Sequence, residues 1–370
     1  MKDEIVNRLL ELAMAVQQIP APTFEEGKRA EYVRTKFLEA GLSDVDVDEA
    51  GNVYGRRKVN DDQSSEARPL VVTAHLDTVF SRGTNLRLTR DEQRIHGPGI
   101  GDNSLGVAAL IVLAQTIQPR GDVWFVANTC EEGLGNLRGM KAVVEKFNSG
   151  VVGYLVIEGA ALGHVYHRAV GVQRYRIFAR TAGGHAWSDY GRPSAVHELA
   201  ALTTHIASLQ LPVSPRTTLN VGKIAGGTSI NTLAAEASIE LDMRSESPQA
   251  LAELVSRVDA LIETANRPGV HVEAESIGQR PGGSIPASHP LVELAVACTR
   301  AQGLEPGLIG GSTDANVPLS RGLPAVVMGV TTGGGAHTLG EYVDVEPVGR
   351  GMDALTEFVE RVFENTTGVE

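Results

Sequence analysis

Four short runs of uninterrupted apolar residues constrain the fold of this chain more than any other feature. Helical stretches lie between them, from Ser104 to about Gln115 and at Gly139–Phe147. Strands that are apolar at every position belong to sheets covered on both faces, and strands that alternate with helices pair in parallel. The four runs are Leu70–Ala74, Val123–Ala127, Tyr154–Ile157 and Ala325–Val330. We therefore expect a mainly parallel sheet between two layers of helices.

The segment before the first apolar run predicts two helices. Apolar residues at helical spacing suit the first helix, which ends near Pro20. Thr23 and Glu26 match the capping-box pattern, in which two side chains satisfy the first N–H groups of a helix. We expect the second helix to start there and to stop at Gly41, because glycine commonly follows a helix end.

The stretch from about residue 169 to 279 has a different pattern of elements. Strands are expected at Val172–Arg180, Thr218–Ile224, Ala237–Arg244 and Val270–Ile277, and helices at Val196–Leu209 and Pro248–Glu263. The order β-α-β-β-α-β is that of a ferredoxin-like arrangement. We therefore expect residues 169–279 to form an α+β domain inserted into a larger domain made of residues 1–168 and 280–370.

The composition narrows the possible partners and the compartment. The 370 residues carry a net charge of −12, so we expect neither nucleic acid nor an anionic membrane surface as a partner. No apolar stretch of about 18 residues predicts a membrane span. The N-terminus lacks a secretory pattern, and Cys130 and Cys298 are too few for a disulfide framework. These features predict a soluble cytoplasmic protein.

Potential metal ligands follow the apolar runs, at the carboxyl ends of the expected strands, where open α/β sheets bind their ligands. Two imidazoles and three carboxylates are donors suited to zinc, cobalt or manganese. The candidate ligands are His75, Glu132, Glu158 and His337, each after one of the four runs, and Asp102 in the turn before a helix. The sequence therefore predicts a site for two divalent metal ions, with zinc as the first choice.

Two further carboxylates complete this candidate site. Glu131 and Glu132 are adjacent at a strand end, so their side chains diverge and one can bind metal while the other faces a water. A carboxylate beside an activated water can move its proton to the leaving amine, a role worth roughly 10²–10⁴ in rate. Asp77, two residues after His75, can accept the other imidazole N–H.

Each of these residues has an ordinary structural alternative when it is taken alone. An aspartate after glycine, such as Asp102, is commonly a turn or helix-capping residue. A glutamate pair is commonly solvated surface, and His337 lies in a glycine-rich loop. The metal hypothesis depends on the five candidate ligands occurring together at the ends of expected elements.

The motifs around these residues resemble those of one enzyme family over nearly the whole chain. They are His75-Leu76-Asp77, Gly101-Asp102-Asn103, Glu131-Glu132-Gly133, Glu158 and His337-Thr338-Leu339-Gly340-Glu341. They are similar to those of the co-catalytic zinc peptidases and deacylases, a family that includes carboxypeptidase G, peptidase T, aminoacylase, acetylornithine deacetylase and succinyl-diaminopimelate desuccinylase. The resemblance implies a three-layer α/β/α zinc-exopeptidase-like catalytic domain with an inserted ferredoxin-like lid and dimerisation domain.

The same resemblance implies a role for each candidate residue. Asp102 bridges the two metals and Glu131 is the general base. Asp77 is the orienting carboxylate. The remaining ligands divide into two pairs, one for each metal: His75 with Glu158, and Glu132 with His337.

The inserted domain carries further matches to this family. His185, between Gly184 and Ala186, resembles the lid histidine, which implies oxyanion stabilisation across a homodimer. Asn231 and Arg244, with Gly226-Gly227, resemble substrate-binding positions, and Gly311–Asn316 resembles a motif near the active site. Arg244 has an alternative in surface pairing with Asp242 or Glu246. One departure is His197, where the family often has asparagine; it does not touch the metal site, but it weakens the carry-over of lid details.

Three functional hypotheses follow from these residues. The first is an exopeptidase that cleaves di- or tripeptides by metal-assisted hydrolysis. The second is an N-acyl amino acid deacylase of the acetylornithine or succinyl-diaminopimelate kind, which differs only in pocket contacts. The third is a metal- or peptide-binding protein without catalysis, which the presence of Glu131 and of all five ligands disfavours. A related aminopeptidase family that lacks the inserted lid is set aside because about 180 residues separate Glu158 from His337.

Overall fold

The computed structural model describes residues 2–59 and 68–364, which form two compact units. Unit 1 comprises Met1–Ala169 and Ser284–Glu370, and unit 2 comprises Val170–Gly283. Within the described ranges, no helix combines the length and apolarity needed to cross a bilayer. Each unit has its own hydrophobic core, so each is described by itself.

The central sheet of unit 1 is mixed, so the expected α/β fold class is confirmed, whereas parallel pairing predominates only among the inner strands. Its inner strands are adjacent in the order β6-β3-β7-β17 and pair in parallel. Nearly all their residues are buried, as expected for strands covered on both faces. The strands are β3 (Leu70–His75), β6 (Val123–Asn128), β7 (Gly153–Glu158) and β17 (Ala325–Gly329).

Antiparallel pairs and short strands extend the central sheet at both edges. A hairpin of β1 (Ser43–Val47) and β2 (Val53–Arg57) pairs with β6. Beyond β17, the sheet continues with β8 (His164–Ala169), β15 (Gly283–Ser284) and β16 (Gly307–Gly311). A separate small sheet in the order β18-β19-β5-β4 contains β4 (Thr89–Arg90), β5 (Arg94–His96), β18 (Gly333–Gly334) and β19 (Tyr342–Asp344).

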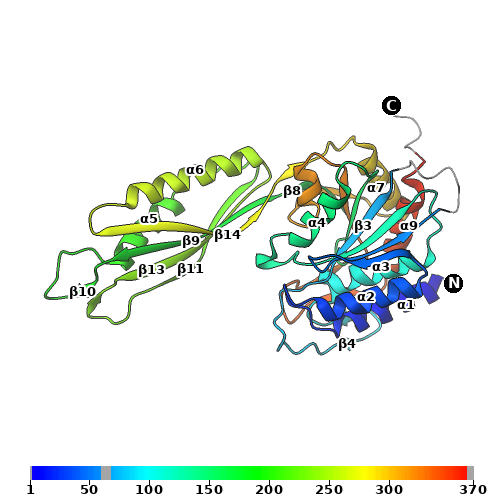
Figure 1. The fold of residues 1–370 in the computed structure, drawn as a ribbon, viewed down its shortest axis with the longest axis horizontal. Helices are drawn as coiled ribbons and strands as arrows, with labels where there is room; N and C mark the ends of the chain where they lie inside the picture. Colours follow the sequence, from blue (N-terminus) through cyan, green and yellow to red (C-terminus); the bar gives the residue numbers. More distant parts are fainter. Residues whose placement is uncertain (1, 60–67, 365–370) are drawn as a thin grey trace. The chain divides into compact units, whose positions relative to one another are not determined.

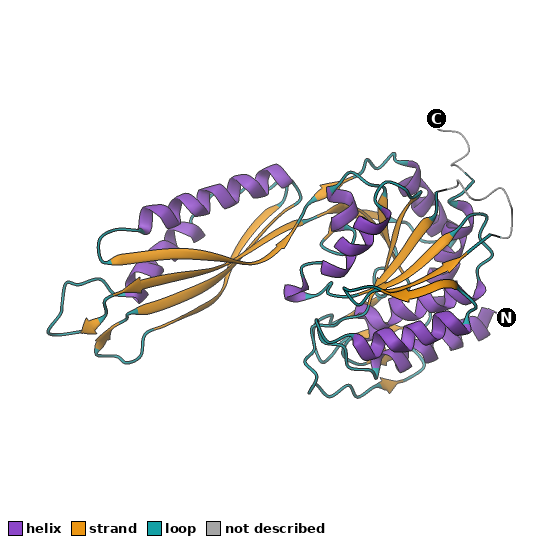
Figure 2. Cartoon of the chain, viewed as in Figure 1, coloured by secondary structure: helices purple, strands orange, loops and turns teal. Residues whose placement is uncertain are grey.

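Helices cover both faces of the central sheet, as Figure 2 shows. The crossover from β3 to β6 contains α3 (Leu105–Thr116), and the crossover from β6 to β7 contains α4 (Arg138–Phe147). These crossovers run in opposite directions across the sheet, so right-handed connections place α3 and α4 on opposite faces. The other helices of unit 1 are α1 (Lys2–Gln17), α2 (Gly27–Glu39), α7 (Pro290–Ala301), α8 (Asn316–Ser320) and α9 (Val348–Arg361), with a π-helical turn η2 (Ile100–Ser104) and a 3₁₀ turn η3 (Gly133–Gly135).

The start of α2 differs from the predicted capping box. Glu26 is the N-cap residue, and its side chain makes no capping hydrogen bond. Its carboxylate accepts N–H groups of Phe24 and Cys130 instead, and the Thr23 hydroxyl donates to Asp77 at 2.9 Å. The capping-box prediction is therefore wrong, because partners brought by the tertiary fold replaced the local ones.

Unit 2 has the ferredoxin-like order expected from the sequence. Its antiparallel sheet is ordered β11-β13-β9-β14, and α5 and α6 pack against it around a core that includes Ile177, Leu241 and Val258 (Figure 1). Ser247 caps α6 by accepting the N–H of Ala250, as its position before Pro248 indicates. The elements are β9 (Gly171–Thr181), β10 (Gly184–His185), α5 (Ala195–Ala207), β11 (Thr217–Gly226), β12 (Thr232–Leu233), β13 (Glu236–Ser245), α6 (Pro248–Ala265) and β14 (Val270–Arg280).

Candidate metal centre

Three of the five candidate ligands lie at or just after the carboxyl ends of strands of the central sheet, and two lie in nearby turns and loops. His75 is the last residue of β3 and Glu158 the last residue of β7. Glu132 follows β6, and Asp102 lies in η2, immediately before α3. His337 lies in the loop between β18 and β19. Neighbouring parallel strands end at the same edge of a sheet, which explains how residues far apart in sequence meet here.

The ligand candidates form two groups that share Asp102. One group is His75, Asp102 and Glu158, the other is Asp102, Glu132 and His337, and within each group the potential ligand atoms lie within 4.8 Å of one another. Asp102 Oδ1 is 3.1 Å from His75 Nε2, and Asp102 Oδ2 is 2.9 Å from His337 Nε2. The two oxygens of one carboxylate therefore face one group each.

Asp77 ties the end of β3 to the end of β6. Its Oδ1 accepts the backbone N–H of Glu131 at 2.9 Å, and its Oδ2 accepts that of Glu132 at 2.9 Å, together with the Thr23 hydroxyl. Asp77 is completely buried, so these bonds are shielded from water. The carboxylate thus sets the backbone from which both glutamate side chains project.

The contacts of His75 determine which of its nitrogens can bind a metal. His75 Nδ1 lies 3.1 Å from the carbonyl oxygen of Asp77 and 3.6 Å from its carboxylate. A carbonyl only accepts, so Nδ1 carries a proton, and Nε2, which faces Asp102 and Glu158, is the nitrogen that could bind a metal. Arg29, itself buried, donates to the carbonyl of Leu76 at 2.7 Å and holds the intervening residue.

The electrostatics of the cluster balance burial against ion pairing. The carboxylates of Asp102 and Glu132, 2.9 and 3.1 Å from Nε2, raise the pKa of His337 to about 10. Burial lowers the pKa of His75, but its hydrogen bonds with Asp102, Asp77 and Glu158 outweigh burial and raise the pKa well above its ordinary value. Burial raises the pKa of Asp102, yet the two histidines hold it below its usual range. Burial raises the pKa of Glu158.

This donor set fits two divalent cations. Each group offers one imidazole and two carboxylates, with Asp102 counted in both. Zn²⁺, Co²⁺ and Mn²⁺ prefer ligands of these kinds. Glu132 Oε1 is buried and makes no hydrogen bond, although it lies 3.1 Å from His337 Nε2. A buried carboxylate oxygen without a donor is costly, and a cation in this group would satisfy it.

Left-handed backbone conformations shape the two loops that present ligands. Cys130, just before Glu131, has φ 58°, and His337 has φ 64°. Residues other than glycine rarely adopt this left-handed region, because the backbone conformation costs them about 1–2 kcal/mol per residue. The bends that result turn the chain sharply after β6 and in the loop before β19. A Cβ on Gly135 would lie 2.5 Å from the carbonyl oxygen of Cys130, so a glycine is needed there for the tight return.

The candidate residues of unit 2 separate into two places. His185 pairs with Thr232 across β10 and β12, and the N–H of Ala186 donates to the carbonyl of Asn231 at 2.9 Å. His185 and Asn231 therefore lie in neighbouring loops. Arg244 lies near the other end of β13, where Nε donates to Asp242 at 2.6 Å, so the structure contains the alternative pairing.

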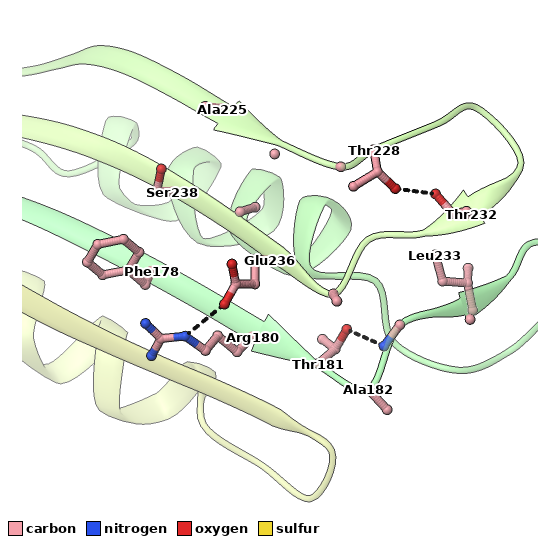
Figure 3. Close-up of a pocket in the computed structure, with 16 residues that line it drawn as sticks. Phe178, Arg180, Thr181, Ala182, Ala225, Thr228, Thr232, Leu233, Glu236 and Ser238 are labelled. Carbon is pink, nitrogen blue, oxygen red and sulfur yellow. Dashed lines mark hydrogen bonds and ion pairs between the residues drawn. The ribbon is translucent and has the colours of Figure 1, made fainter.

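A cavity of about 750 Å³ lies beside the loops of His185 and Asn231 in unit 2. Figure 3 shows its side chains, including Arg180 facing Glu236 and Thr228 facing Thr232. Gly183-Gly184 and Gly226-Gly227 also line it. The structure thus brings Gly226-Gly227 to the segment that leads to His185. The lining residues belong to unit 2 and include none of the candidate metal ligands.

Several residues of the centre were missed at the level of sequence. Thr23 was interpreted as a helix cap, and Glu341 and Asn103 were quoted in motifs without a role. Asp314 was named only within a motif, yet it is completely buried and accepts a hydrogen bond from Asn128 at 2.7 Å. Burial raises the pKa of Asp314 to about 7. The one available signal was position, since Asn103 and Glu341 lie one and four residues from expected ligands.

The fold and the ligand set together define a metal-dependent hydrolase of the α/β class. The family model described as peptidase family M20/M25/M40 matches residues 71–361. The chain belongs to this family, and it is a metallopeptidase-family hydrolase that uses metal to cleave its substrate.

Relatives of known sequence and structure support the same assignment. A Mycobacterium tuberculosis protein provisionally named succinyl-diaminopimelate desuccinylase DapE is 27% identical over 363 residues, covering 95% of this chain and 97% of that protein. A tripeptidase structure from Staphylococcus aureus is similar with a TM-score of 0.82 and 25% identity, covering 97% and 99% of the two chains. Aminopeptidase PepT from Bacillus cereus has the same fold, with a TM-score of 0.79, 23% identity, and coverage of 97% and 99%.

Proposed function

We propose that this chain is an exopeptidase that hydrolyses di- and tripeptides with two bound zinc ions. The observation that carries the proposal is the pair of ligand groups sharing Asp102, with Glu131 next to Glu132 in the sequence and its backbone N–H held by Asp77. The S. aureus relative, named a tripeptidase, supports peptides of this length as substrates. Cobalt or manganese can serve in the same donor set.

Each residue of the centre has a defined task in this reaction. His75, Asp102 and Glu158 would hold one metal, and Asp102, Glu132 and His337 would hold the other. When bound, such a metal pair lowers the pKa of a water to about 7 and polarises the substrate carbonyl.

Glu131 acts as the general base of the proposed reaction. Its carboxylate takes the proton of the attacking water and passes it to the nitrogen of the leaving amine. The residue is 5% exposed, so bulk water competes little for that proton. The bond from the Glu131 N–H to Asp77 fixes the backbone from which this carboxylate projects.

Residues of unit 2 are proposed to complete the site. His185 would stabilise the oxyanion, and Asn231 would bind substrate beside it. For Arg244 to bind a substrate carboxylate, that carboxylate must replace Asp242. In its support, a planar guanidinium binds carboxylates in bidentate fashion.

We propose that the protein forms a homodimer through unit 2. Trp187, Tyr190 and Ile230 lie in the loops around His185 and Asn231, with exposed fractions of 87%, 90% and 103%. Large apolar side chains grouped this way favour burial against another chain. Light scattering on a Trp187→Ser/Tyr190→Ser protein would test this, and an unchanged dimer mass would contradict the proposed surface. We also propose a cytoplasmic location without nucleic-acid or membrane partners, in keeping with the net charge of −12 and the free cysteines.

A second candidate reaction is the deacylation of N-acyl amino acids. One observation favours it: the relative provisionally named a desuccinylase matches 95% of the chain. The bond broken is an amide in both cases, so the same residues would serve. The two reactions differ in the group on the acyl side of the scissile bond.

Hydrolysis of a mixed substrate panel tests the proposal. Metal-reconstituted protein would be offered dipeptides, tripeptides, and N-acetyl and N-succinyl amino acids. We expect cleavage of short peptides, lowered roughly 10²–10⁴-fold in Glu131→Gln, because removal of a general base costs about that factor. Glu145→Gln, which changes an exposed glutamate on α4, is the matched control. Preference for acylated amino acids would replace the peptidase by the deacylase, and full activity of Glu131→Gln would refute its role as base.

A further inference from the structure

We infer that Glu341 and Asn103 are positioning residues that hold Asp102, from two sides, as the ligand shared by both metal groups. The inference rests on the proposed function only in taking Asp102 as a metal ligand. Neither side chain belongs to the ligand groups. Both are buried, with exposed fractions of 2% for Glu341 and 0% for Asn103.

The Glu341 carboxylate gathers the backbone N–H groups of the segment that carries Asp102. Oε2 accepts the N–H of Gly99 at 2.7 Å. Oε1 accepts the N–H of Gly101 at 2.7 Å and that of Asp102 itself at 2.8 Å. Hydrogen bonds to an ionised carboxylate are roughly twice as strong as neutral ones. With these three bonds, both oxygens of the Glu341 carboxylate accept N–H groups, and one of the bonds fixes the backbone of Asp102 directly.

The same carboxylate connects Asp102 to the loop of His337. Glu341 lies four residues after His337, at the end of the loop that leads into β19. Strand β19 pairs with β5, where Tyr342 lies opposite His96, and the N–H of Gly97 donates to the carbonyl of Glu341 at 2.9 Å. The pairing of β19 with β5 and the bond from Gly97 therefore fix the backbone of Glu341. The Glu341 side chain in turn fixes the position of Asp102 relative to the loop of His337.

Asn103 connects the other side of Asp102 to Glu158. Its Nδ2 donates to the carbonyl of Ile157 at 2.8 Å, and its Oδ1 accepts the N–H of Gly159 at 2.9 Å. One side-chain amide thus binds the backbone on both sides of Glu158, as a neighbouring strand would.

Glycines provide the space for this contact. A Cβ on Gly106 would lie 2.0 Å from Asn103 Oδ1, and one on Gly159 would lie 2.2 Å from the carbonyl oxygen of Gly101. Larger residues at these positions would push Asn103 or the Gly101 peptide away. The close approach of η2 to the end of β7 therefore depends on both glycines.

The position of Asp102 matters more than that of any other ligand because its two oxygens serve different groups. A shift that improves its contact with one group worsens its contact with the other. Side chains that hold ligands in place are typically worth about 10- to 100-fold in metal affinity. Loss of the Glu341 contact should therefore weaken both metal sites together.

The test is metal binding by Glu341→Gln and Glu341→Asp. In Glu341→Gln, the side-chain NH₂ must face at least one of the three backbone N–H groups, so at least one of the three hydrogen bonds is lost. In Glu341→Asp, the charge remains but the side chain is one methylene too short. Glu346→Gln, which alters a glutamate 79% exposed and paired with Arg350, is the matched control.

Zinc would be titrated into each metal-free protein against a chromophoric chelator. We expect affinity about 10- to 100-fold lower for both equivalents in both Glu341 variants and unchanged affinity in the control. Hydrogen exchange of the metal-free proteins should show faster exchange at Gly99, Gly101 and Asp102 in the Glu341 variants. Asn103→Ser should weaken zinc binding similarly, with faster exchange at Gly159.

Two results would overturn the inference. One is faster exchange with wild-type zinc affinity, which would make the contact purely structural. The other is unchanged exchange at the three amides. A failure of the proposed reaction can be told apart from a failure of this inference. If the wild-type protein binds two zinc ions but cleaves no substrate, the reaction is refuted, and the binding measurements still decide the role of Glu341. If the wild-type protein binds no zinc, both proposals fall.

Discussion

Replacing Asp77 by asparagine tests how the backbone of the candidate base is held. The substitution preserves shape, but whichever way the amide is turned, its NH₂ faces a backbone N–H that the carboxylate accepted at 2.9 Å. A buried donor left without a partner costs about 1–3 kcal/mol, and hydrogen bonds that lose a charged acceptor weaken by about 1 kcal/mol each. Removal of a buried charge offsets part of this loss. We expect Asp77→Asn to lower the free energy of unfolding by about 2–4 kcal/mol at pH 7.

Urea unfolding of the metal-free protein measures this change. The chain has two tryptophans, Trp124 in unit 1 and Trp187 in unit 2, so a Trp187→Phe background makes fluorescence report unit 1. Asp91→Asn is the matched control, because Asp91 also accepts two backbone N–H groups, from Gln93 and Arg94, but lies in an exposed turn. We expect a smaller effect there.

The pH dependence gives a second check on Asp77. Burial alone would raise the pKa of Asp77, but hydrogen bonds with His75 and with the backbone of Glu132 and Glu131 outweigh it and lower the pKa. Because the pKa of Asp77 is lower in the folded state, its contribution to the free energy of unfolding is fully present above the unfolded-state pKa of about 4. It is lost as the pH falls through the lower folded-state value.

The difference between wild type and Asp77→Asn should therefore be constant between about pH 6 and 8 and shrink below about pH 4. Zinc affinity of the variant should fall about 10- to 100-fold. A variant within about 0.5 kcal/mol of wild type, the size of ordinary surface substitutions, would refute the reasoning.

Two other expectations follow from packing and from burial. In Gly351→Ala, the new Cβ would lie 1.8 Å from the carbonyl oxygen of Val330, so we expect a loss of about 1–3 kcal/mol or more in urea unfolding. Gly27→Ala, with nothing within 4 Å, should instead gain about 0.4–1 kcal/mol, and equal effects of both would contradict the contact. Burial raises the pKa of the Cys130 thiol to about 11 and that of Cys298 to about 12, so about one thiol in a thousand or fewer is ionised at pH 8. Iodoacetamide should label the folded protein at least about 100-fold more slowly than the urea-unfolded protein, and equal rates would show that the thiols are accessible.

The sequence by itself determined the kind of fold and the set of candidate ligands. Continuous apolar runs such as Leu70–Ala74 cannot be half exposed, so they require a sheet covered on both faces. Ligands directly after such strands must lie at the carboxyl edge, which is why His75 and Glu158 were predictable as neighbours. The order of elements in unit 2 was also predictable, from the spacing of its apolar residues and from its turn residues. Both depend only on residues close together in the sequence.

The tertiary structure alone decided which side chains hold the ligands in place. Thr23 had a local capping role available and instead donates to Asp77, 54 residues away. Glu341 accepts the N–H of Asp102 across 239 residues, and Arg244 pairs with Asp242 within its own strand. A buried carboxylate binds whichever donors the packed chain brings within reach. The identity of those donors depends on how strands and loops pack, which no local sequence pattern encodes.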